Sequence, residues 1–187
     1  MPEMERRVDT SDQKSAVLWT DAAGPGRMVA AVMWDPHTDK MYHTYFKAPQ
    51  GLLDHFLPRR DNMIQVTELL GIVLGYATFE ECVRERFVTW YTDNDAVLAT
   101  LLNGAAAQHA ADMNVLVGRF WLAATRDNVA VNLARVPSAM NIADGPTRDY
   151  FCRLNMMKSI FVEPRLPRWA QGIWNLLVYE GVDSLFG

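Results

Sequence analysis

Cysteine is scarce in this chain of 187 residues, which contains only Cys82 and Cys152. Two cysteines are too few for a framework of disulfides, so an apolar core has to stabilise the fold. We expect both thiols to be reduced and partly buried, and we assign a catalytic role to neither. Reduced cysteines are typical of proteins inside the cell, which predicts a location in the cytoplasm or the nucleus.

Long apolar runs are also missing. No segment reaches the roughly 20 consecutive apolar residues of a membrane-spanning helix, and the polar N-terminus does not resemble a secretory signal. The sequence therefore predicts neither a membrane anchor nor a membrane partner. Half of the residues are hydrophobic and 21% are charged, which is an ordinary balance for a globular domain with a sizeable core.

Basic residues are not in excess, because 18 Lys and Arg stand against 22 Asp and Glu, for a net charge of -4. Domains that bind nucleic acid are more often basic, so this balance counts against such a partner. It does not exclude one, because a cluster of carboxylates lowers the isoelectric point by itself and bound divalent cations reverse the local field.

The length suits one domain with a small appendage. We expect a flexible leader over residues 1–15, an α/β domain over 16–151 and a C-terminal extension over 152–187. The extension contains two prolines and then a tryptophan-containing segment that favours a short helix. We expect it to pack on the domain or on a neighbour.

Apolar periodicity and turn residues predict the elements of the domain. The predicted strands are 16–20, 28–34, 41–46, 87–91 and 129–136. The predicted helices are 64–79, 94–102, 113–124 and a last one that carries Asp144. The order βββαβααβα indicates a five-stranded mixed sheet with helices packed on it.

The stretch 135–148, with the letters RVPSAMNIADGPTR, is the most distinctive part of the chain. Pro137 cannot donate to a ladder, so the preceding strand should stop there. Ser138 or Asn141 can cap a helix that holds Asp144 in its first turn. The pair that follows, Gly145–Pro146, limits how far this helix can run.

Three further segments place an acid at the end of a strand or on a helix face. Together with Asp144 the candidates are Asp21, Glu68 and Asp93. Three of the four have a simpler reading: Asp144 complements a helix dipole, Glu68 faces solvent or pairs with an arginine, and Asp93 caps a helix. Asp95 competes with Asp93, although it suits the first turn of the next helix better.

Carboxylates gathered at one place suit the hydrolysis of a phosphodiester. Two divalent ions about 4 Å apart can activate water and stabilise the charge that develops on phosphorus and on the leaving oxygen. Mg²⁺ prefers hard oxygen ligands, which carboxylates provide. Without a cation the same groups repel, which raises some of their pKa values. The four histidines lack metal-ligand spacing, and Ser138 has no nearby histidine, so other hydrolytic sites are unsupported.

These motifs resemble the ribonuclease H domains of reverse transcriptases, nearest to those of hepadnavirus-like polymerases and DIRS-type retrotransposons. The closing stretch VPSAMNIADGPTR is the most specific, and it is accompanied in order by Thr20–Asp21–Ala22, Thr67–Glu68–Leu69–Leu70 and Thr92–Asp93–Asn94. The resemblance covers residues 16–151. It implies Mg²⁺- or Mn²⁺-dependent cleavage of the RNA strand of an RNA–DNA hybrid, with Asp21, Glu68, Asp93 and Asp144 as ligands of two ions, and a polymerase domain as a partner.

The chain departs from that family at several points. No histidine stands between Val129 and Asp144, and the segment from Gly104 to Asp112 lacks the Lys and Arg of a basic helical handle. The alternative is therefore a catalytically inactive module of the same fold that binds protein or nucleic acid. A transposase or exonuclease core is a third reading, which the fold alone does not exclude.

Substrate grip would then fall to arginines elsewhere in the chain, which can bind backbone phosphates. The candidates are Arg59, Arg60, Arg119, Arg126, Arg135 and Arg148.

Overall fold

The first three strands form an antiparallel meander, as the turn residues between them predict. β1 (Ala16–Ala23) pairs with β2 (Met28–Asp35), and β2 pairs with β3 (Lys40–Lys47). The structure, a computed structural model, describes residues 15–23, 27–58 and 63–165. Residues 1–14 of the expected leader, the segment 24–26 between β1 and β2, and the expected helix near Trp169 lie outside these ranges.

The other half of the sheet is parallel. β4 (Phe87–Thr92) lies beside β1, and β5 (Ala130–Arg135) lies beside β4, both in parallel register. The sheet contains a sixth strand within the described residues, β6 (Ile160–Phe161), which pairs with β3 and gives the order β5-β4-β1-β2-β3-β6. Five strands were expected from the sequence, because a two-residue strand is too short to show alternation. The mixed α/β class is confirmed.

Helix α2 (Ile64–Val83) packs across β1 and β2. Two glycines on its sheet-facing side permit a very close approach. A Cβ at Gly71 would lie 2.9 Å from Val29 Cγ1, and one at Gly75 would lie 2.9 Å from Ala31 Cβ. Glu68 precedes them by three and seven residues, so it lies on the same face of the helix and is directed at the sheet.

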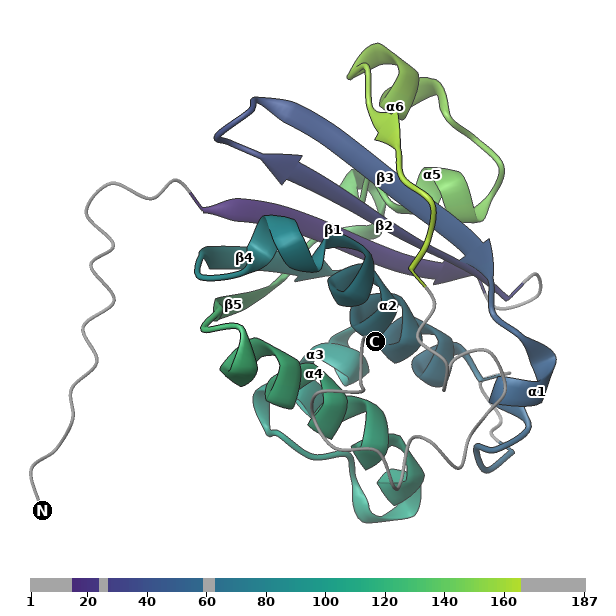
Figure 1. Cartoon of the computed structure of the whole chain (residues 1–187). Helices are drawn as coiled ribbons and strands as arrows, with labels where there is room; N and C mark the ends of the chain where they lie inside the picture. Colours follow the sequence, from purple (N-terminus) through teal and green to yellow (C-terminus); the bar gives the residue numbers. More distant parts are fainter. Residues whose placement is uncertain (1–14, 24–26, 59–62, 166–187) are drawn as a thin grey trace, which may run out of the picture.

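Figure 1 shows α2, α3 (Asp95–Leu102) and α4 (Asn114–Arg126) on one side of the sheet. This side holds the larger core, in which Tyr76, Trp90 and Phe120 are fully buried and in ring contact. The remaining elements before β5 are α1 (Gln50–Leu53) and the 3₁₀ helix η1 (Gln108–Met113). No helix in the described ranges is long and apolar enough to span a membrane.

The closing segment lies on the opposite side of the sheet (Figure 1). It contains the 3₁₀ helix η2 (Ser138–Met140) and the short helices α5 (Asp144–Thr147) and α6 (Cys152–Met156). Ala143 and Leu154 from this segment pack against Ala30 and Val32 of β2 in a second, smaller core. Burying this face holds the segment against β1 and β2, beside the carboxylates.

Two local expectations are wrong. Asp21 is not at the end of its strand, because β1 continues to Ala23. Neither Ser138 nor Asn141 is the N-cap of the closing helix: α5 begins at Asp144, and its N-cap residue is Ala143, whose side chain makes no cap bond. The limit set by Gly145 and Pro146 is confirmed, since α5 ends at Thr147.

Candidate metal centre

Three of the four expected carboxylates meet beside the sheet. Asp21, Glu68 and Asp93 each offer an oxygen, and these oxygens all lie within 4.8 Å of one another. Asp21 and Glu68 are buried, whereas Asp93 is half-buried. Such a group of acids is the kind of oxygen-only site that a hard divalent cation prefers.

The parallel pairing of β1 and β4 explains why Asp21 and Asp93 lie together. Trp19 is paired with Tyr91 across the two strands. Asp21 follows Trp19 by two residues, and Asp93 follows Tyr91 by two. Because side chains two residues apart in extended backbone point to the same face of the sheet, the two aspartates lie side by side. Glu68 approaches from α2, where the glycines bring the helix close to the backbone of β1; a Cβ at Gly71 would lie 3.7 Å from the carbonyl oxygen of Asp21.

Glu68 is the least solvated acid of the cluster. Only 4% of the residue is exposed, and its Oε2 atom has no hydrogen-bond partner among the described residues. Burial, followed by the charges of Asp21 and Asp93, raises the pKa of Glu68 to about 9, while a hydrogen bond with the backbone of Ala22 opposes this. An unpaired carboxylate oxygen at this depth is costly unless a proton or a cation satisfies it.

Asp21 lies between the other acids and the closing segment. Burial raises the pKa of Asp21 to about 6, and the charges of Asp93 and Asp144 add to this shift. The hydroxyl of Thr147 donates to Asp21 Oδ2 at 2.6 Å. This hydrogen bond and the positive charge of Arg148 oppose the rise in the pKa of Asp21. At neutral pH without a cation, Asp21 is therefore mostly ionised and Glu68 mostly protonated.

Asp144 stands at the rim rather than within the group of three. Its Oδ1 accepts a bond from Arg148 Nε at 2.7 Å, and 32% of its side chain is exposed. Its carbonyl oxygen lies 2.9 Å from the Thr147 hydroxyl, which also contacts Asp21. The structure thus places Asp144 beside Asp21 but holds its carboxylate in an ion pair.

The residues after β4 separate the two rival aspartates. Asn94 caps α3, because its Oδ1 accepts from the backbone amides of Ala96 and Val97 at 3.1 and 3.2 Å. Asp93 therefore does not serve as the cap. Asp95 lies in the first turn of α3 with 73% of its side chain exposed, and it pairs with Arg135 Nε at 2.6 Å.

Two residues beside the cluster were not singled out from the sequence for this role. The sequence indicates Asn141 only as a helix cap, and Thr147 only as part of the closing stretch. Asn141 is 2% exposed and Thr147 is 5% exposed, and both bond to residues of the cluster. The sequence feature that could have indicated them is the closing stretch, in which Asn141 and Thr147 each lie three residues from Asp144.

The expected arginines are scattered by the fold. Arg148 and Arg135 lie near the cluster, paired with Asp144 and Asp95. Arg119 is 7% exposed within α4, where a phosphate cannot readily reach it. Arg59 and Arg60 lie outside the described residues.

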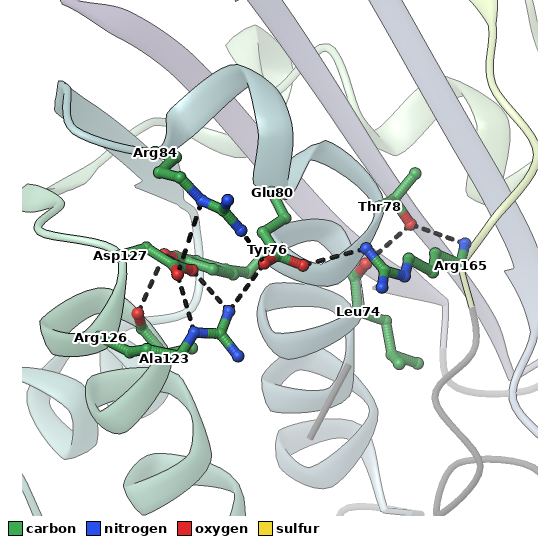
Figure 2. Close-up of polar contacts among 9 residues, drawn as sticks. All are labelled: Leu74, Tyr76, Thr78, Glu80, Arg84, Ala123, Arg126, Asp127 and Arg165. Carbon is green, nitrogen blue, oxygen red and sulfur yellow. Dashed lines mark hydrogen bonds and ion pairs between the residues drawn. The ribbon is translucent and has the colours of Figure 1, made fainter. Parts of the chain in front are cut away.

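Arg126 belongs to a separate polar network at the far end of α2 (Figure 2). Its Nη2 lies 2.8 Å from Glu80 Oε1 and 2.7 Å from Asp127 Oδ2, and the hydroxyl of Tyr76 donates to the same Asp127 oxygen at 2.9 Å. Glu80 is twelve residues from Glu68 on α2, roughly 18 Å at 1.5 Å per residue. This network stabilises the fold and leaves Arg126 away from the carboxylates.

A mixed sheet that begins with an antiparallel meander and continues through parallel crossovers, with acids on β1, on α2 and after β4, is the ribonuclease H fold. Solved structures agree. The chain is similar to the N-terminal RNase H domain of a Mycobacterium tuberculosis protein, determined as a fusion with maltose-binding protein, at a TM-score of 0.53 and 16% identity, over 76% of this chain and 96% of that one.

It is likewise similar to LC11-RNase H1, determined in complex with an RNA/DNA hybrid, with a TM-score of 0.55 and 9% identity over 75% of this chain and 99% of that one. RNase H1 of Halobacterium salinarum is also similar, with a TM-score of 0.53 and 14% identity over 73% of this chain and 98% of that one. No protein-family model and no curated protein sequence matches the chain. At these identities the likeness establishes the fold.

Proposed function

We propose that this protein is a divalent-metal-dependent endoribonuclease that cleaves the RNA strand of RNA–DNA hybrids. The observation that carries the proposal is the buried Oε2 of Glu68, which has no partner among the described residues and stands in a cluster of acids. An unpaired carboxyl oxygen buried beside other acids is costly unless a proton or a cation satisfies it, and a cation would compensate all three acids at once.

The residues present fit Mg²⁺, and also Mn²⁺, because every donor is a carboxylate oxygen. Asp21, Glu68 and Asp93 would hold a first ion, and Asp144 would complete a second site with Asp21. When bound, two such ions supply the activation of water and the stabilisation of charge on the phosphate and on the leaving oxygen.

The side chains of the chain itself have three tasks in this mechanism. Asp21 lies centrally and is the candidate for the ligand shared by both sites. Glu68, with its raised pKa, has to release a proton before it can bind a cation. Arg148 holds Asp144 in the resting protein and is exposed at the rim of the cluster. We assign Arg148 to a backbone phosphate of the substrate, where its charge offsets the repulsion between acids and nucleic acid.

The hybrid is the substrate class that the fold neighbours favour, since one of them is an RNase H1 determined with an RNA/DNA hybrid. The closing stretch, with its resemblance to retroelement domains, favours a ribonuclease H module of a reverse transcriptase. A polymerase domain would then supply the grip that a basic handle provides elsewhere. Residues 152–187 are the candidates for contacting it, apart from those that form α6 and β6 on the domain.

A cleavage assay tests the proposal. The protein is incubated with end-labelled RNA–DNA hybrid, RNA duplex and DNA duplex, each with Mg²⁺, with Mn²⁺ and with EDTA. We expect metal-dependent cuts in the RNA of the hybrid alone, and none with Asp21→Asn. Cleavage in EDTA, or equal cleavage by Asp21→Asn, would contradict the proposal.

One observation favours a second candidate, an inactive module that binds protein or nucleic acid. The fourth acid, Asp144, is held in an ion pair at 2.7 Å, and the chain as a whole is acidic. Against this, exposed ion pairs contribute only about 0–1 kcal/mol, so Mg²⁺ or a phosphate can separate this one. Hybrid binding without any cleavage in Mg²⁺ or Mn²⁺ would favour the inactive module.

A further inference from the structure

A short segment on the face opposite α2 connects Asp21 of β1 with Asp93, the residue that follows β4. Asn141 is 2% exposed, and its amide nitrogen donates to the carbonyl oxygen of Thr20 at 3.0 Å and to Asp93 Oδ1 at 3.3 Å. Its Oδ1 accepts from the backbone amide of Ala143 at 3.2 Å. One side chain thus joins the residue before Asp21, the carboxylate of Asp93 and the start of α5.

Thr147 forms the second connection, six residues later. Its hydroxyl is 2.6 Å from Asp21 Oδ2 and 2.9 Å from the carbonyl oxygen of Asp144, and the residue is 5% exposed. The turn that contains Thr147 has little freedom. The amide of Tyr150 donates to the Gly145 carbonyl at 2.9 Å, and a Cβ at Gly145 would clash with the Tyr150 carbonyl oxygen.

We propose that Asn141 and Thr147 are positioning residues, which hold the carboxylates of Asp93 and Asp21 in place for cation binding. This inference rests on the proposed function and assigns roles within the same site. Asn141 donates to Asp93 and Thr147 to Asp21, so each carboxylate has a neutral donor that fixes its orientation without neutralising it.

The physical reason is repulsion between acids that no cation has yet compensated. Like charges at this separation favour rotation of the carboxylates away from one another. A hydrogen bond to one oxygen opposes that rotation and leaves the other oxygen for a cation. Residues that orient ligands in this way typically change metal affinity by about 10- to 100-fold when they are removed.

The decisive variant is Thr147→Val, which keeps the shape of the side chain and removes the hydroxyl. Thr147→Ser is the rescue variant, because it keeps the hydroxyl and loses one methyl group. The matched control is Thr44→Val in β3: Thr44 is 2% exposed, and its hydroxyl has no hydrogen-bond partner in the part of the chain that the structure describes. Asn141→Ala tests the first connection, that of Asn141 to Asp93, independently of Thr147.

The experiment measures Mn²⁺ binding to the full chain by electron paramagnetic resonance without substrate, and then the Mg²⁺ concentration for half-maximal hybrid cleavage. We expect Thr147→Val and Asn141→Ala to weaken Mn²⁺ binding about 10- to 100-fold, and the Mg²⁺ requirement to rise in parallel. Thr147→Ser and Thr44→Val should stay within about threefold of the parent on the same scale. The KM for hybrid at saturating Mg²⁺ should not change.

The experiment distinguishes failure of the positioning roles from failure of the proposed function. If the parent binds Mn²⁺ and cleaves hybrid but both Thr147→Val and Asn141→Ala bind Mn²⁺ as tightly as the parent, the positioning roles are wrong and the proposed function stands. If the parent binds no Mn²⁺ while circular dichroism shows it to be folded, the proposed function is wrong and the positioning roles fall with it. Weakened binding in Thr147→Ser equal to that in Thr147→Val would mean that packing, rather than the hydroxyl, carries the effect.

Discussion

Replacing Asp21 with Asn should stabilise the metal-free protein at neutral pH while abolishing cleavage. Asn keeps the shape of Asp and can still accept the Thr147 hydroxyl through Oδ1, but it carries no charge. In the parent, the pKa of Asp21 is raised from 3.8 to about 6, mainly by burial. The folded protein therefore binds the proton more tightly than the unfolded chain, and folding stability falls as pH rises from about 4 through 6.

The size of this effect follows from the shift. One pKa unit corresponds to about 1.4 kcal/mol, so ionised Asp21 lowers the free energy of unfolding by roughly 3 kcal/mol at pH 7.5 and by less than about 1 kcal/mol at pH 4. Asp21→Asn should recover most of that difference. At roughly 2–4 °C per kcal/mol for a chain of this size, the melting temperature should rise by roughly 5–10 °C at pH 7.5 in EDTA.

The assay is urea and thermal unfolding of parent and variant in EDTA at pH 4 and pH 7.5, repeated in Mg²⁺ at the higher pH. Mg²⁺ should stabilise the parent more than the variant, because binding to the folded state shifts the equilibrium. Asp95→Asn is the control: the Asp95 side chain is 73% exposed, so this substitution should change the free energy of unfolding much less than Asp21→Asn does. A stability change in Asp21→Asn that is the same at both pH values would show that the charge of Asp21 does not destabilise the fold.

Three further predictions follow from the same geometry. Stabilisation by Mg²⁺ should be larger at pH 8.5 than at pH 6, measured by thermal shift, because the pKa of Glu68 is about 9 and its proton opposes the cation. Asp93→Asn should lose cleavage by orders of magnitude, whereas Asp95→Asn should keep most of it in the hybrid assay. In urea unfolding, Gly75→Ala should lower the free energy of unfolding by about 1 kcal/mol or more, because the new methyl group meets the Cβ of Ala31, which is fixed to the backbone. Gly71→Ala should cost less, because its methyl group meets Val29 Cγ1, which can shift.

The sequence was sufficient to predict most of the sheet, because its strands are apolar, alternate regularly and are bounded by turn residues. The order of acids along the chain predicted that Asp21, Glu68 and Asp93 would meet, and the structure places them together. That placement depends on the parallel register of β1 and β4 and on the close contact of α2 with the sheet at Gly71.

The closing segment was harder to predict, for a physical reason. A helix of four residues has no apolar periodicity, so the extent of α5 and the contacts of Asn141 and Thr147 are set by tertiary packing. The surroundings of the arginines are likewise set by tertiary packing. Charge along a sequence does not reveal that Arg119 would be buried or that Arg126 would pair with Glu80 and Asp127.

Anomalous diffraction from crystals soaked with Mn²⁺ would show directly whether the three carboxylates bind a cation. We expect an anomalous peak roughly 2 Å from carboxylate oxygens of Asp21, Glu68 and Asp93, the distance typical of such hard cations. We also expect the Arg148–Asp144 pair to open when a second peak fills beside Asp21, and Asp21→Asn crystals to lose the density. A well-ordered cluster without any anomalous peak at saturating Mn²⁺ would mean that the carboxylates do not form a metal site.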